Sequence, residues 1–167
     1  MLPAYQRHFA PGLADRDLAQ ARAMTDCLRH RGPNSKGFFS DGRCGLGNTR
    51  LSILDLSSAA SLPASSEDGS IVLAYNGEIT NFRELAMAFS LDKKYGLRNT
   101  SDTEVLLRLY QELGMDCLKH LSGMFAFFIY DRNKQKGWLV RDFYGTRPLF
   151  YMQKKDRLYF SSEIKSF

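Results

Sequence analysis

The residues best suited to chemistry lie in the stretch Leu73–Phe82, which reads Leu-Ala-Tyr-Asn-Gly-Glu-Ile-Thr-Asn-Phe. Asn-Gly often forms the turn of a β-hairpin, but no second strand pattern follows it. Instead, Asn81 to Glu84 have the pattern of a helix N-cap with an acidic residue three places on. We therefore predict that Asn76-Gly77 lies where a strand ends and a helix begins. Backbone N–H groups at such a place can face a ligand, and Gly77 would let that ligand approach closely.

Two charged residues could bind the ends of a free amino acid. Arg50 interrupts an otherwise apolar strand pattern, so it is either an exposed strand residue or a clamp for a carboxylate. Asp102 lies in a capping box, Ser101–Glu104, and is either a helix-start anion or a buried carboxylate that receives an ammonium group. Two N–H donors at Asn76-Gly77 would suit a tetrahedral oxyanion.

The cysteines and histidines indicate no metal centre. Cys27, Cys44 and Cys117 have no CxxC spacing, and their odd number favours reduced thiols in the cytoplasm. Cys27 and His30 are either a reactive pair on a helix or a buried cysteine beside a helix-end histidine. The other histidines have no acidic or cysteine partners at metal spacing, so we predict no metal site.

Composition indicates an ordinary soluble domain. The chain has 167 residues, 44% of them hydrophobic, and a net charge of +5 carried by scattered basic residues, so we expect no nucleic-acid partner. The longest apolar run, 124–130, is too short to span a bilayer, and no secretion pattern precedes it, so we expect no membrane partner.

Periodicity predicts an α+β fold of antiparallel strands with the helices in two blocks. Gly45 and Gly47 in the second strand of the first hairpin would leave room for another backbone or a ligand. The expected helices are 15–31, 81–89, 101–113 and 116–121; the expected strands are a hairpin over 38–54, then 124–130, 138–140, 149–152 and 158–161; 57–70 and 91–100 are expected to be connections.

Several segments together resemble the N-terminal glutaminase domain of glutamine-hydrolysing asparagine synthetase, a class II glutamine amidotransferase of the N-terminal nucleophile hydrolase type. The similarity covers about residues 18 to 167, and the segments occur in the family's order. They are His30-Arg31-Gly32-Pro33-Asn34-Ser35-Lys36-Gly37, Arg50 to Ser57, Tyr75 to Leu85, Ser101 to Leu107, Gly123 to Phe127, Val140-Arg141-Asp142, Arg147 to Tyr151, and Ser162-Glu163-Ile164-Lys165.

The resemblance implies a single domain over 1–167 with a four-layer α/β/β/α sandwich of two mainly antiparallel sheets. It also implies roles in binding L-glutamine. Arg50 would hold the α-carboxylate, and Asp102 the α-ammonium with help from Glu78 and the Gly77 backbone. The Asn76 side chain and the Gly77 N–H would form the oxyanion hole.

The sequence departs from this family at the nucleophile. The family uses a cysteine exposed as the first residue, with its own α-amine as the base. Here Leu2 stands near that place, and no cysteine occurs before Cys27. The family's synthetase domain, with its Ser-Gly-Gly-x-Asp-Ser phosphate motif, is also absent, so we expect no cofactor in this chain; ATP and Mg would belong to that domain.

Three hypotheses follow from these observations. The first, which we prefer, is a glutaminase domain that keeps its glutamine pocket but lacks the nucleophile, with a synthetase domain or subunit as a possible partner. The second is an active glutaminase whose natural chain begins with cysteine. The third is a structural or interaction module that binds no glutamine.

Overall fold

The structure is a computed structural model that describes residues 5–6, 14–50, 62–97 and 101–167. The strands are β1 (Tyr5–Gln6), β2 (Ser35–Ser40), β3 (Gly45–Arg50), β4 (Ala64–Ser65), β5 (Ile71–Ile79), β6 (Gly123–Asp131), β7 (Lys136–Arg141), β8 (Phe150–Lys154) and β9 (Arg157–Ser161). The α-helices are α1 (Ala14–Asp26), α2 (Phe82–Ala88), α3 (Leu91–Tyr95) and α4 (Asp102–Leu113), and the short 3-10 helices are η1 (Arg29–Arg31), η3 (Gly114–His120) and η4 (Ile164–Ser166).

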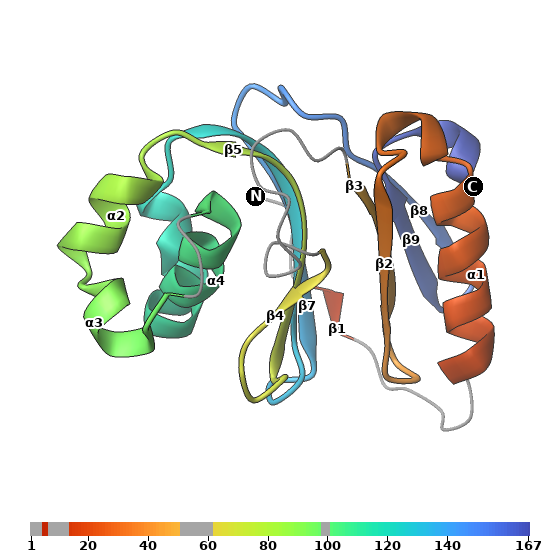
Figure 1. Cartoon of the computed structure of the whole chain (residues 1–167). Coiled ribbons are helices and arrows are strands. Elements are labelled where there is room, and N and C mark those ends of the chain that lie inside the picture. Colours follow the sequence, from red (N-terminus) through yellow and green to blue (C-terminus); the bar gives the residue numbers. More distant parts are fainter. Residues whose placement is uncertain (1–4, 7–13, 51–61, 98–100) are drawn as a thin grey trace.

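These elements form four layers (Figure 1). Helices α2, α3 and α4 cover one face of a five-stranded sheet in the order β1-β7-β6-β5-β4. The hairpins β2–β3 and β8–β9 lie against the other face, and α1 covers them from outside. Every strand pairing among the described residues is antiparallel, so the predicted α/β/β/α sandwich is confirmed.

The central strands β5 and β6 carry two hydrophobic cores, one on each face of the sheet. Phe125, Phe127 and Ile129 pack toward the helices, while Phe128 and Tyr130 pack toward the hairpins. Because both faces are covered, the strand reads as a continuous apolar run instead of alternating with polar residues.

Helix α4 begins as its sequence predicts. The Ser101 hydroxyl accepts the Glu104 N–H at 3.2 Å, which is one half of the expected capping box. The Glu104 side chain accepts from Arg108 Nε at 2.9 Å, and both side chains are buried. The pattern therefore located the helix start, whereas the Glu104 carboxylate pairs with Arg108 one turn later in the same helix.

The predicted strand-to-helix junction at Asn76-Gly77 is wrong. Strand β5 continues through both residues to Ile79, paired with β6 over its whole length, and α2 begins only at Phe82. Asn81 does not cap α2 with its side chain either. Its amide donates to the His120 carbonyl at 2.8 Å and accepts from the Ser122 N–H at 3.0 Å, so it ties the β5–α2 turn to the loop before β6.

Other boundaries also differ from the sequence-based expectations. The first α-helix ends at Asp26 and is followed by the separate 3-10 turn η1. The expected connection 91–100 contains α3, and the expected loop 57–70 contributes β4, which pairs with β5. The close approach predicted at Gly47 is made by α1, since a Cβ there would lie 2.0 Å from Thr25 Oγ1.

Gly77 is required by strand packing. A Cβ at this position would lie 2.5 Å from the Met124 carbonyl oxygen and 2.7 Å from Phe125 Cα, both backbone atoms of β6. The neighbouring Glu78 side chain on the same strand is exposed.

We predict that Gly77→Ala lowers the free energy of unfolding by about 1–3 kcal/mol, because the β5–β6 pair must separate to accept the methyl group. Chemical denaturation would measure the loss. Glu78→Ala on the same strand should stay within about 0.5 kcal/mol of the parent protein. Equal stability of Gly77→Ala and the parent would contradict the close contact.

Candidate functional site

The candidate site lies at the outer edge of β5, away from β6. Asn48 of β3 reaches this edge and donates to the Tyr75 carbonyl at 3.4 Å. Asp102, the first residue of α4, reaches the same edge and accepts the Ile79 N–H through Oδ2 at 3.0 Å. The ends of β3, β5 and α4 therefore meet along five residues of β5, from Tyr75 to Ile79.

The backbone N–H of Gly77 is directed toward this same edge. Gly77 lies opposite Phe125 in the β5–β6 register. Phe125 uses both backbone groups on its other side, because its carbonyl accepts the Asp142 N–H and its N–H donates to the Asp142 carboxylate. Gly77 and Phe125 therefore form a non-hydrogen-bonded pair of the antiparallel ladder. The backbone N–H and carbonyl of Gly77 consequently point away from β6.

Asn76 lies on the opposite face of β5 from Tyr75, because strand residues alternate between faces. Its side chain lines a cavity of about 500 Å³ between the five-stranded sheet and the layer of hairpins. Its Nδ2 is buried and has no hydrogen-bond partner among the described residues. A buried, unsatisfied donor costs about 1–3 kcal/mol, so an N–H group aimed at a cavity suits a ligand acceptor.

Asp102 receives two donors on one oxygen. The Tyr75 hydroxyl donates to Oδ2 at 2.5 Å, and the Ile79 N–H donates to the same atom. Burial, with the Asp102 charge and its hydrogen bond, raises the pKa of Tyr75 well above its ordinary value, so this phenol stays protonated. The Asp102 carboxylate therefore binds a backbone N–H at the edge of β5. The sequence did not predict this contact.

The two remaining predicted residues lie on the same elements. Glu78 shares the cavity face of β5 with Asn76 by alternation, and its side chain is exposed. Arg50 is the last residue of β3, two residues beyond Asn48 and opposite Ser35 in the hairpin. The Arg50 side chain lies outside the described part of the structure.

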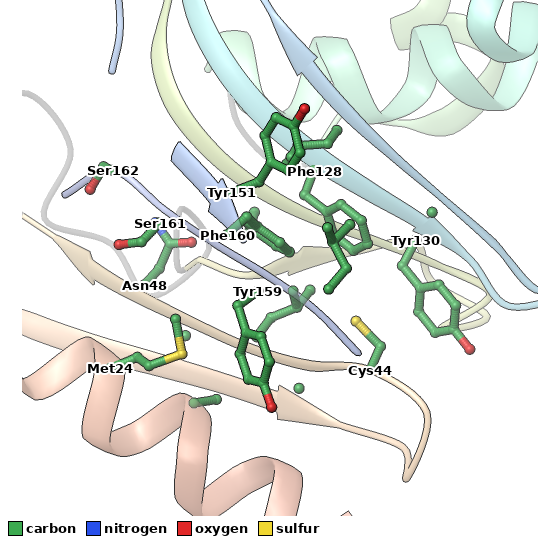
Figure 2. A pocket seen from close by; sticks show the side chains of 18 of the residues that line it. Met24, Cys44, Asn48, Phe128, Tyr130, Tyr151, Tyr159, Phe160, Ser161 and Ser162 are labelled. Carbon is green, nitrogen blue, oxygen red and sulfur yellow. The ribbon is translucent and has the colours of Figure 1, made fainter. Parts of the chain in front are cut away.

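The cavity has an aromatic wall and a thiol at its far end. Phe128 and Phe160 stack with ring centroids 4.6 Å apart. Figure 2 shows Asn48 and Cys44 on opposite sides of the view. Four residue-to-residue steps of extended chain separate them, which span about 13 Å. Cys44 is therefore remote from the Asn48 end of β3, where Tyr75 and the β5 edge lie.

The other two cysteines lie outside this cavity. Cys117 is fully buried in the core on the helix side of the sheet, and Cys27 is exposed at the end of α1, donating to the Ala23 carbonyl. The Cys27–His30 pair is not formed, since His30 bonds to Glu163. Across the described residues, no group of three or more His, Cys, Asp or Glu side chains could hold a metal. No described helix has the length and apolarity to cross a bilayer.

Comparison with known proteins identifies the family. Residues 10–167 match the glutamine amidotransferase domain. The chain belongs to this family. It is 43% identical over 145 residues to asparagine synthetase [glutamine-hydrolyzing] 2 of Bacillus subtilis, which covers 87% of this chain and 19% of that protein. It is 37% identical over 148 residues to asparagine synthetase B [glutamine-hydrolyzing] of Escherichia coli, covering 88% and 26%.

The solved structures agree on the fold. Glutamine phosphoribosylpyrophosphate amidotransferase from B. subtilis superposes with a TM-score of 0.72 at 22% identity, covering 98% of this chain and 42% of that one. The resemblance read from the sequence motifs is thus confirmed. The chain spans about a fifth to a quarter of the length of the two synthetases.

Within this amidotransferase domain, Asp142 is a positioning residue that sequence reasoning left without a role. Its buried carboxylate accepts the N–H groups of Phe125, Thr146 and Arg147 at 3.0–3.3 Å. Burial alone would raise the pKa of Asp142, but these hydrogen bonds together lower it. The carboxylate fixes the loop that leads from β7 to the cavity-lining Pro148. The signal in the sequence was an Asp two residues after the apolar run Trp138–Val140, with Gly145 close behind, a typical turn pattern.

Glu163 joins two of the amidotransferase motifs. Its carboxylate lies 2.9 Å from His30 Nε2, 3.3 Å from Arg31 Nη1 and 3.2 Å from Lys165 Nζ. The hydrogen bond from His30, with those from Lys165 and Arg31, outweighs burial and lowers the pKa of Glu163 to about 2. This cluster connects the segment after α1 to the segment after β9, so it holds one end of the hairpin layer in place.

We predict that Asp142→Asn destabilises the domain by about 1.5–3 kcal/mol near neutral pH, since bonds to a charged acceptor are lost. The folded pKa of Asp142 is lowered, so its contribution is complete above the ordinary value of 3.8 and is lost as the pH falls below it. Denaturation at pH 7 and pH 3 should therefore show a smaller difference between parent and variant in acid. A difference independent of pH would contradict this assignment.

Proposed function

We propose that this domain binds L-glutamine at the outer edge of β5. The amide carbonyl of glutamine would accept from Asn76 Nδ2 and from the Gly77 N–H, the geometry of an oxyanion hole. Family membership supports the ligand class. The observation that carries the proposal is the Asn76 amide, because its buried N–H group has no described partner and borders a cavity.

The charged ends of glutamine match the charged residues around this edge. Asp102 would receive the α-ammonium, with Glu78 beside it on the exposed end of β5. Arg50 would bind the α-carboxylate, because a guanidinium forms paired hydrogen bonds with a carboxylate. The end of β3 that carries Arg50 is held against β5 by the Asn48 bond to Tyr75, which supports this assignment.

We expect this chain to bind glutamine without hydrolysing it. Attack on the amide requires a nucleophile, and Leu2 has only a hydrocarbon side chain. Cys44 precedes β3 and lies about 13 Å along the chain from Asn48, too far to replace a nucleophile at Asn76. No cofactor is needed for binding. ATP and Mg would serve a synthetase domain or subunit, which is the partner we propose.

A second candidate function is a protein-interaction module. Phe143 and Tyr144 are 95% and 89% exposed, and their rings contact each other edge to face. They lie on the loop that Asp142 fixes, so these apolar groups are presented on a rigid support. Such a surface suits a protein partner and requires no bound glutamine.

Calorimetry with glutamine tests the binding proposal. We expect saturable heat from the parent protein and at least about 10-fold weaker binding in Arg50→Ala and Asp102→Asn, since each loses bonds to a charged group. Arg132→Ala is a matched control, because Arg132 pairs with Asp41 beside the turn after β6, at the far end of that strand. No heat at millimolar glutamine from folded protein would refute the proposal and leave the interaction module.

Release of ammonia tests the missing nucleophile. We expect no turnover in the parent chain and measurable turnover in Leu2→Cys, where removal of Met1 would expose a thiol beside an α-amine that titrates near pH 8. Leu2→Ser, which offers a weaker nucleophile, is the control. Turnover by the parent chain, or no turnover by a folded, glutamine-binding Leu2→Cys, would count against this interpretation.

A further inference from the structure

We propose that Tyr75 is a positioning residue that makes this site selective for ligands with an α-ammonium group. It would act through Asp102, without touching the ligand. The inference rests on the proposed binding of glutamine and adds a residue that determines specificity.

The Tyr75 hydroxyl is buried and committed to one acceptor. The side chain is 6% exposed, and its hydroxyl donates to Asp102 Oδ2. Because Tyr75 lies on the helix face of β5, its ring reaches Asp102 from beneath the strand while Ile79 donates from the strand edge. Two hydrogen bonds to the same oxygen restrict the rotation of the carboxylate.

This arrangement assigns different tasks to the two oxygens of Asp102. Oδ2 accepts from Tyr75 and from the Ile79 N–H. Among the described residues, no hydrogen bond reaches Oδ1. A ligand ammonium would therefore be received by Oδ1, whose direction is set by the two bonds on the other oxygen. Without the phenol, the carboxylate would turn more freely about its Cβ–Cγ bond and would lose orientation that an ammonium group requires.

The high pKa of Tyr75 keeps the phenol a donor at all ordinary pH values. The positive charge of Arg147 acts on the Tyr75 hydroxyl in the opposite sense, but burial and Asp102 outweigh it. The phenol therefore interacts with Asp102 only as a hydrogen-bond donor.

The test compares glutamine with 4-carbamoylbutanoate, which is glutamine without its α-amino group. The parent protein should bind glutamine at least about 10-fold more tightly than this analogue. Tyr75→Phe should weaken glutamine binding by about 5- to 10-fold and change binding of the analogue by less than about 2-fold. Added to Asp102→Asn, it should change glutamine binding by less than about 2-fold, as expected for residues that act through one another.

Tyr110→Phe is the matched control. Tyr110 is also buried on the helix side of the sheet, and its hydroxyl donates to Asp131 at 3.1 Å. It lies eight residues after Asp102 on α4, about 12 Å along the helix. Both variants should lose stability, but only Tyr75→Phe should change the ratio of the two affinities.

The outcomes separate the two proposals. If Tyr75→Phe weakens the binding of both ligands equally, the positioning role is wrong while glutamine binding stands. The same conclusion follows if it changes the ratio of the two affinities no more than Tyr110→Phe does. If the folded parent protein binds neither ligand, both proposals fail. A parent protein that binds the two ligands equally would refute the role of the ammonium group and leave an amide-binding site.

Discussion

The site depends on the unbroken register of β5 with β6. Nine consecutive pairs, from Ile71 opposite Asp131 to Ile79 opposite Gly123, leave no bulge that could turn a side chain to the other face. The alternation therefore places Asn76 toward the cavity, Tyr75 toward the helices, and the Gly77 backbone groups at the outer edge. A shift of one residue would exchange the faces and direct the Asn76 amide into the hydrophobic core under α4.

Two aspartates stabilise opposite edges of this strand pair. Asp102 accepts a backbone N–H at the outer edge of β5, and Asp142 accepts the Phe125 N–H on the far side of β6. Each carboxylate also holds a second element, the start of α4 in one case and the β7–β8 loop in the other. At each edge, a backbone N–H that points away from the β5–β6 pair donates to a carboxylate. Hydrogen bonds to a charged acceptor are stronger than hydrogen bonds to a neutral one.

The sequence predicted elements better than it predicted the connections between them. The helix at Asp102–Leu113 and the strand around 124–130 followed from periodicity, because their burial is decided by local pattern. The turn predicted at Asn76-Gly77 and the cap predicted at Asn81 were wrong, because turn and cap propensities are local. In the fold, Asn76 and Gly77 pair with β6, and Asn81 bonds to the 120–122 loop. The motifs identified the candidate residues. The Tyr75–Asp102 and Asp142 contacts join segments that are distant in sequence, so they could be found only from the fold.

Among the residues proposed to bind glutamine, Asn76 differs in kind from Gly77 and Asp102. Gly77 is required because a side chain would strike β6, and Asp102 closes the edge of β5, so stability alone would explain both residues. The Asn76 amide gains no described hydrogen bond and leaves a buried donor unsatisfied. Folding alone would favour an apolar or smaller residue at this position, since an unpaired buried donor is destabilising. Binding of an acceptor at the cavity supplies the compensation that the folded chain lacks, and this asymmetry makes the site the best-supported location for a ligand.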